Sequence, residues 1–167
     1  RDVLWYYPEN FLSRLKEFEE QNRLEFDYSS LSSNQWPDKG CFFILDSDLK
    51  SEAVTLWLKI KKQLRAGARL ITLDSGFNSV EVQANLKLKP LPGREYLALL
   101  AIFKLWLDKQ SGSLKFYPGL EELAGKLSHY QVEELAASSG LDVASVKAAV
   151  NLLAGNNHWT LILCERF

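Results

Sequence analysis

Two blocks in the middle of the chain share one pattern, a mostly apolar run that ends at an aspartate. Residues 41–45 read Cys-Phe-Phe-Ile-Leu and stop at Asp46, and residues 68–73 read Ala-Arg-Leu-Ile-Thr-Leu and stop at Asp74. A short apolar run before a polar loop is typical of a strand buried on both faces, as in a parallel sheet covered by helices. The pattern therefore predicts two parallel strands.

The segment between the two runs has the spacing of an amphipathic helix. Ser51 is the expected N-cap, and Gly67 is expected to end the helix. The apolar positions recur three to four residues apart and form one stripe, namely Ala53, Leu56, Ile60 and Leu64. The other face carries the cations Lys59, Lys61, Lys62 and Arg65, which we expect to face water. Strand, helix and strand together make a βαβ unit.

The flanking segments are less regular. Residues 9–22 place Phe and Leu at helical spacing among charged residues and predict a surface helix, whereas residues 27–40 read as an irregular loop. Residues 86–90 alternate apolar and basic positions, which predicts a short strand with one exposed face. Residues 96–107 are apolar nearly all round and predict a helix buried between two layers. That stretch is much shorter than the roughly 20 residues needed to cross a bilayer.

The last third of the chain predicts mostly helix. Three short helices are expected over residues 120–127, 131–138 and 142–154, with Asp142 as the N-cap of the third. Residues 159–164 return to strand chemistry, and we expect this strand to pair back into the same sheet. The predicted fold is a Rossmann-like, three-layer α/β domain with a mostly parallel sheet and a helical C-terminal third.

Composition narrows the class of protein. The 167 residues carry 20 Lys+Arg against 21 Asp+Glu, so no overall field attracts nucleic acid or anionic lipid, and no local patch stands out in the sequence. Two cysteines are too few for a disulfide framework or a four-thiolate cluster. The sequence has no methionine, which predicts a piece of a longer protein. We expect one domain over 1–167, with an N-terminal helix and loop over 1–39 and an α/β core over 40–167.

The loops at the strand ends are where a ligand is expected, because open parallel sheets bind ligands beyond the carboxyl ends of their strands. The first loop is Asp46-Ser47-Asp48 and the second begins at Asp74. Neither has the G-x-G-x-x-G spacing of a dinucleotide site. The three aspartates are ligands that Mg²⁺ favours, but acidic caps and solvated loop ends are the commoner role of such residues. We therefore predict no metal site.

Other chemistry is sparse. His129 and His158 have no neighbouring cysteine or serine that would form a nucleophile pair, so a structural or exposed role is favoured for both. Cys41 and Cys164 lie in expected apolar strands, where a buried thiol is inert. Phe103 and the neighbouring Trp106 are expected in the core. The sequence indicates no catalytic residue.

Residues 132–147 have the outline of a helix-turn-helix around Gly140. A helix that reads DNA carries basic or amide groups on its outer face, whereas residues 142–154 offer only Lys147 and Asn151. Ordinary helix packing is therefore favoured over DNA binding.

Several segments in order resemble the molybdopterin oxidoreductase superfamily, which includes the large subunits of formate dehydrogenase and nitrate reductase. After the strand and loop of residues 40–48, residues 64–74 read L-R-A-G-A-R-L-I-T-L-D and are similar to the family pattern R-x-G-A-K-L-I-V-x-D-P-R. A-N-L-K-L at 84–88 and P-G-R-E at 92–95 are similar to A-D-L-x-L followed by P-G-T-D. The later helical pair and last strand also fit, so the match covers about residues 40–167. Within the superfamily, the large iron–sulfur subunit of NADH-quinone oxidoreductase (respiratory complex I) is the most similar.

The resemblance implies where a cofactor would lie. In this family the strand-end loops hold the guanine dinucleotide part of a molybdenum or tungsten cofactor. By position, Asp46, Ser47 and Asp48 stand in the family's G-x-N-P loop, Asp74 at its D-P-R aspartate and Glu95 at its P-G-T-D aspartate. Here Asp replaces both the Gly and the Asn, and Ser-Gly replaces Pro-Arg. Two added carboxylates and one lost guanidinium disfavour an anion, so the resemblance implies a degenerate cofactor site.

The expected function follows from this resemblance. The chain is expected to be a catalytically silent scaffold within a redox subunit of the complex I kind, without a cofactor of its own, while iron–sulfur clusters lie elsewhere in the parent. The alternative is a working molybdopterin guanine dinucleotide domain of a formate dehydrogenase-like enzyme. Expected partners are other domains of its own chain and other subunits, with no nucleic acid and no direct membrane insertion. The expected location is the cytoplasm, or the cytoplasmic face of a membrane within a complex.

Overall fold

The computed structural model describes residues 2–5, 40–109, 120–156 and 159–163. These residues belong to two compact units. The first unit runs through residue 72 and also takes in residues 78–85 and the last strand. The second comprises Leu73–Phe77 and Leu86–Gly155. The expected helix over 9–22 and the loop over 27–39 lie outside the described residues.

The sheet confirms the predicted α/β class. In the first unit β1 (Asp2–Trp5), β2 (Cys41–Leu45), β3 (Arg69–Leu73) and β5 (Trp159–Leu163) lie in the order β1-β5-β2-β3, followed in the strand order by β4. β5 pairs in parallel with both β1 and β2, as expected for a strand returning to the same sheet. The Arg69 amide donates to the Gly40 carbonyl, so β2 and β3 begin side by side and run parallel. The sequence did not predict β1.

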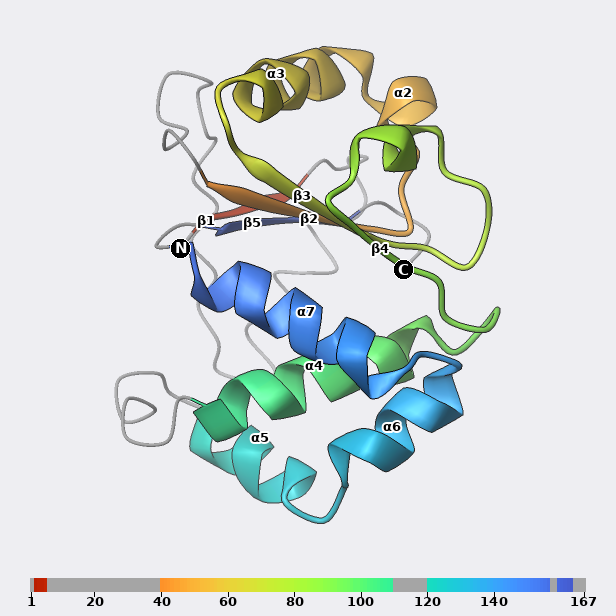
Figure 1. The fold of residues 1–167 in the computed structure, drawn as a ribbon, viewed down its shortest axis with the longest axis vertical. Helices are drawn as coiled ribbons and strands as arrows, with labels where there is room; N and C mark the ends of the chain where they lie inside the picture. The colour runs from red at the N-terminus through yellow and green to blue at the C-terminus, as the bar shows by residue number, and fades with distance from the viewer. Residues whose placement is uncertain (1, 6–39, 110–119, 157–158, 164–167) are drawn as a thin grey trace, which may run out of the picture. The chain divides into compact units, whose positions relative to one another are not determined.

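The first unit packs a core against one face of these strands. All five residues of β2 are buried, as an unbroken apolar run predicts. Phe42 and Ile44, which alternate along β2, contact the same cluster as Leu70 of β3 and Ile162 of β5. Helix residues such as Ile60 complete this cluster. Figure 1 shows the helices of this unit on that side of the strands.

The amphipathic segment forms two helices where one was predicted. These are α2 (Leu49–Glu52) and α3 (Val54–Arg65). Ala53 separates them because its backbone leaves the helical region, with φ −147° and ψ 65°. Ser51 is therefore a residue of α2, and the N-cap is Asp48 instead. The predicted stripe holds all the same, since Ala53 and Ile60 are buried and Leu56 and Leu64 pack against them.

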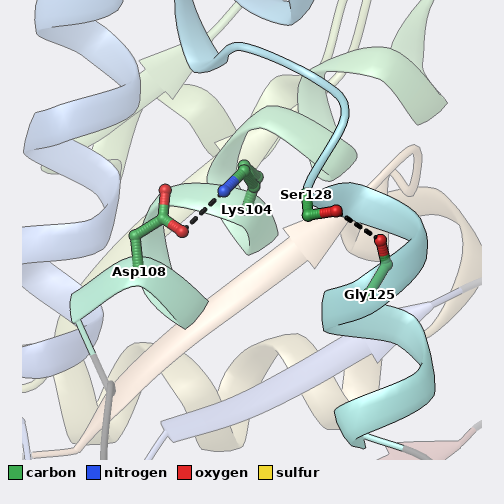
Figure 2. Close-up of polar contacts among 4 residues, drawn as sticks. All are labelled: Lys104, Asp108, Gly125 and Ser128. Atoms are coloured by element: carbon green, nitrogen blue, oxygen red, sulfur yellow. Dashed lines mark hydrogen bonds and ion pairs between the residues drawn. The ribbon is translucent and has the colours of Figure 1, made fainter.

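The second unit is mainly helical. It contains β4 (Leu86–Leu88), α4 (Glu95–Lys109), α5 (Leu120–Leu127), α6 (Val132–Ser139) and α7 (Val143–Ala154), close to the predicted ranges. The Asp74 amide donates to the Leu88 carbonyl of β4. α4 contacts both α6 and α7, which explains why apolar residues surround it. In Figure 2, Lys104 and Asp108 of α4 form an ion pair at 2.6 Å, and the Ser128 hydroxyl donates to the Gly125 carbonyl at the end of α5.

The turn between α6 and α7 follows the prediction. Gly140 ends α6 with φ 82°, the left-handed conformation that glycine adopts readily. A Cβ at this position would lie 2.6 Å from Cγ of Leu91, so the site also lacks room for a side chain. Asp142 caps α7, as predicted, by accepting a hydrogen bond from the Ser145 amide at 2.5 Å.

Candidate functional site

The loop after β2 begins with an unusual backbone conformation. Asp46 has φ 42°, and among the described residues other than glycine no other φ is positive. Residues that carry a Cβ disfavour positive φ, although Asp and Asn tolerate it better than most. The molybdopterin oxidoreductase pattern that the sequence resembles has glycine at this position. The loop therefore keeps a backbone suited to glycine while carrying an aspartate.

The next two residues of this loop are held by polar contacts within the first unit. Ser47 is buried, and its hydroxyl donates to Oε2 of Glu52 at 2.9 Å. Oδ1 of Asp48 accepts from the Lys50 amide at 3.3 Å and from the Ser79 hydroxyl at 2.6 Å. Asp48 thus caps α2 and also ties the loop to a segment 31 residues further along.

Asn78 fixes that later segment against the loop. Its side chain is buried, and Nδ2 donates to the Ser47 carbonyl at 2.8 Å. Oδ1 of the same amide accepts from the Val80 amide at 3.0 Å, which caps the 3₁₀ helix η1 (Ser79–Gln83). One side chain therefore uses both ends of its amide to hold two loops together.

Lys50 is the cation nearest this cluster in sequence. Its ammonium donates to the Ser79 carbonyl at 2.6 Å and lies 5.8 Å from the centre of the Trp57 ring. Residues 46–52 carry three carboxylates and this one cation. The carboxylates are those of Asp46, Asp48 and Glu52. The balance of charge in the loop disfavours a diphosphate.

The loop after β3 lies in the second unit and is organised separately. Asp74 is buried, and its Oδ1 accepts from the Gly76 amide at 2.7 Å, which closes a tight turn. The Lys89 ammonium donates to the Gly76 carbonyl. The family's D-P-R arginine has no counterpart in this turn, because Ser75 and Gly76 occupy those two positions.

Glu95 meets the same turn from the start of α4. A hydrogen bond from the Ser75 side chain lowers the pKa of the Glu95 carboxyl below its ordinary value of 4.5, while a smaller effect of burial raises it. Backbone hydrogen bonds add to the lowering. Glu95 is therefore a carboxylate near neutral pH, placed where the helix N-terminus also favours a negative charge. Asp74 and Glu95 thus both contact the Asp74–Gly76 turn, Asp74 through the Gly76 amide and Glu95 through the Ser75 side chain.

Sequence reasoning missed the residues that connect these positions. Asn78 and Ser79 bind the first loop, Lys89 binds the second, and Ser75 joins the second loop to Glu95. An Asn-Ser pair before a short helix is a capping signal that could have identified residue 78. The contact between residues 48 and 79 has no local signature.

Of the remaining candidates, Cys41, Phe103 and Trp106 lie in packed surroundings. Burial raises the pKa of the Cys41 thiol to about 12, with a smaller opposing effect of Arg69, so this thiol is protonated and inert. His129 is exposed, whereas His158 and Cys164 lie outside the described residues. Trp106 is buried and stacks on Phe103 with ring centres 5.7 Å apart, as expected of core residues.

The described ranges contain neither a cluster of metal ligands nor a membrane span. Within these ranges, no three His, Cys, Asp or Glu side chains converge in a way that could hold a metal ion. Among the helices described, none is long and apolar enough to cross a membrane.

The helix-turn-helix outline is present, and one of the two polar residues on its outer face is bonded within the same unit. Lys147 and Asn151 are exposed on α7. Oδ1 of Asn151 accepts from the Lys109 ammonium of α4 at 2.7 Å, so this amide braces two helices of the same unit. The inner faces of α6 and α7 pack against α4. This geometry is that of a helical bundle whose faces stabilise one another.

Comparison with known proteins identifies the fold. No family model and no curated protein matches the sequence. Among solved structures, acetylene hydratase from Pelobacter acetylenicus matches with a TM-score of 0.66 and 21% identity. The match covers 74% of this chain and 18% of that one, so the chain spans less than a fifth of the matched protein. The likeness shows that this chain shares its fold with part of acetylene hydratase, in agreement with the predicted α/β class.

Proposed function

We propose that this chain is a structural domain of a redox subunit, with a molybdopterin oxidoreductase-like fold and strand-end loops that no longer hold the cofactor. The parent proposed is a large iron–sulfur subunit of the NADH-quinone oxidoreductase kind, on the basis of the similar segments over residues 64–95. In this role the domain supplies a rigid α/β core and contacts to its own chain and to neighbouring subunits. Its residues do no chemistry.

The observation that carries this proposal is the use of the loop side chains within the fold. Asp48, which replaces the family's asparagine, caps α2 and binds Ser79. The Ser47 hydroxyl donates to Glu52 rather than outward. A loop that binds a dinucleotide directs donors at phosphate oxygens. Here the first unit's loop directs a carboxylate and a hydroxyl at its own backbone and side chains.

One feature of the second unit favours the alternative of a working guanine dinucleotide site. Glu95 is ionised near neutral pH, and a carboxylate accepts hydrogen bonds from guanine ring N–H groups. Phe77, two residues after Ser75, is 89% exposed and so presents its ring to solvent. A base could stack on such a ring while Glu95 reads its edge.

Titration of the protein with GDP distinguishes the two functions. The scaffold predicts no saturable binding, because the loops carry excess negative charge and lack the family's arginine. Saturable binding that is weakened by Glu95→Gln, which preserves side-chain volume, would establish the alternative. Glu133→Gln, an exposed glutamate on α6, is the matched control and should change nothing.

A second measurement addresses the cofactor itself. Elemental analysis of the full-length parent, purified from its own cells, should find neither molybdenum nor tungsten in stoichiometric amount. Stoichiometric metal together with saturable GDP binding would overturn the proposal.

A further inference from the structure

The solvent-facing side of α3 joins cations to exposed apolar side chains. Val54 and Leu58 are 52% and 59% exposed, and they lie four residues apart on one side of the helix. Lys62 and Arg65 continue the same row and are exposed, as is Lys59 beside it. We call these five residues the basic face of α3. Figure 1 shows α3 over the strands of the first unit. Trp57 and Ile60 of α3 belong to the buried core, whereas the five residues of the basic face are exposed.

The surrounding chain strengthens this positive charge. Residues 53–73 contain five cations, since Lys61 and Arg69 add to the three on the basic face, and no Asp or Glu. The carboxylates nearest in sequence are Glu52 and Asp74. Arg69 is exposed at the start of β3, just after the helix ends. A chain with a net charge of −1 thus concentrates positive charge on one helix.

Helix stability explains only part of this arrangement. Lys62 and Arg65 lie in the last turn, where the helix dipole favours cations. The dipole does not account for Lys59 in the middle of the helix or for the absence of carboxylates over 21 consecutive residues. It also does not account for the pairing of Val54 with Leu58, two exposed apolar side chains that neighbour each other on the same side of the helix as the cations.

We propose that the basic face of α3 docks on an anionic lipid surface. Lysine and arginine side chains are attracted to anionic headgroups, while Leu58 and Val54 enter the boundary between headgroups and acyl chains. Each cation near such a surface strengthens partitioning about fivefold. The three cations of this face, together with the exposed Arg69 and the two apolar side chains, give reversible adsorption, not insertion.

Two other kinds of partner, a nucleic acid and a protein, fit the face less well. Nucleic acid is bound through phosphate contacts together with stacking or base-edge hydrogen bonds, and neither Val54 nor Leu58 supplies these. A stable protein interface buries roughly 800 Å² on each partner with close shape complementarity. A single convex helix offers little of that shape, whereas a lipid surface deforms around it. The inference is independent of the proposed scaffold function.

Vesicle sedimentation tests the proposal. The protein should bind vesicles of phosphatidylcholine mixed with phosphatidylglycerol, should not bind pure phosphatidylcholine vesicles, and should dissociate as salt is raised. Lys59→Glu with Lys62→Glu changes the charge by four units and should weaken partitioning by roughly two orders of magnitude or more. Leu58→Gln should weaken it severalfold at unchanged charge.

A matched variant controls for total charge. Lys87→Glu with Lys147→Glu alters two exposed lysines of the second unit by the same four units and should leave binding within about twofold. Equal loss in both double variants would overturn the proposal, and so would no binding to anionic vesicles. Tighter binding to duplex RNA than to anionic vesicles at the same salt would assign the face to nucleic acid instead. Circular dichroism of each variant verifies that it is folded.

Discussion

Asp46 shows how one residue can keep a backbone conformation while changing the chemistry of a loop. Its φ of 42° lies in the left-handed region, where glycine is the easiest residue to place. Aspartate tolerates this region, so the turn after β2 survives the change. The carboxylate adds a negative charge at a strand end where the resembling family brings phosphate. The loop after β2 therefore combines a left-handed backbone with a carboxylate side chain.

Two substitutions at Asp46 measure this backbone requirement. Asp46→Gly and Asp46→Val both remove the carboxylate, so the difference between them reports the backbone alone. The glycine variant should be more stable than the valine variant by about 1–2 kcal/mol, because a β-branched residue is the hardest to place at positive φ. Urea unfolding of both variants measures this difference in the free energy of unfolding. Equal stability would show that residue 46 leaves the left-handed region at little cost.

Ser75 controls the ionisation of Glu95. Removing the hydroxyl with Ser75→Ala should raise the pKa of Glu95 toward 4.5, because the Ser75 hydrogen bond is the largest cause of its lowering. A lowered pKa adds stability above the unfolded-state value, and this stability is lost as pH falls through the folded-state value. Ser75→Ala should therefore destabilise the protein at neutral pH and matter little in acid.

The titration of Glu95 followed by NMR checks this prediction directly. Ser128→Ala removes a serine hydroxyl that is bonded to Gly125 in the same unit, and it should leave the Glu95 titration unchanged. An unchanged Glu95 pKa in Ser75→Ala would assign the shift to the backbone hydrogen bonds instead.

At the scale of elements, the hydrophobic pattern predicted most helices and strands to within two residues. β2, β3, β5 and α4 through α7 lie where apolar runs and helical spacing placed them. The pattern failed at α2 and α3, because Ala53 breaks a segment whose spacing is continuous. It also missed β1 and η1, which are short and depend on pairing or capping by distant residues.

The α6–α7 turn depends on a single glycine. Gly140→Ala should lower the free energy of unfolding by about 1–2 kcal/mol, because alanine is strained at φ 82° and its Cβ would clash with Leu91. Gly125→Ala is the control, since a Cβ at this α5 position meets nothing within 4 Å. That variant should be unchanged or up to about 1 kcal/mol more stable. Thermal unfolding of both variants compares their stability with that of the unmodified protein. A similar loss of stability in the two variants would contradict the prediction.

At the scale of the whole molecule, Cys41 reports on the core of the first unit. Its thiol is 1% exposed, and burial raises its pKa to about 12. In a Cys164→Ser background, a maleimide should leave native protein unlabelled at pH 8 and label it only as denaturant unfolds this unit. Mass spectrometry measures the labelled fraction. Rapid labelling under native conditions would show that the first unit opens locally around β2.

The sequence by itself determined the order of strands and helices, the parallel sheet and the positions of the strand-end loops. Those features follow from local periodicity, since buried runs and amphipathic stripes are encoded by neighbouring residues.

Only the tertiary structure decided what the loop side chains do. Asp48 and Ser79 lie 31 residues apart, as do Ser47 and Asn78, and their contacts exist because α2 and η1 are brought together in the first unit. The exposed fraction of Leu58 likewise depends on which side of α3 meets the sheet. Periodicity specifies which residues can be buried together, but contacts between distant side chains depend on how the chain returns to meet itself.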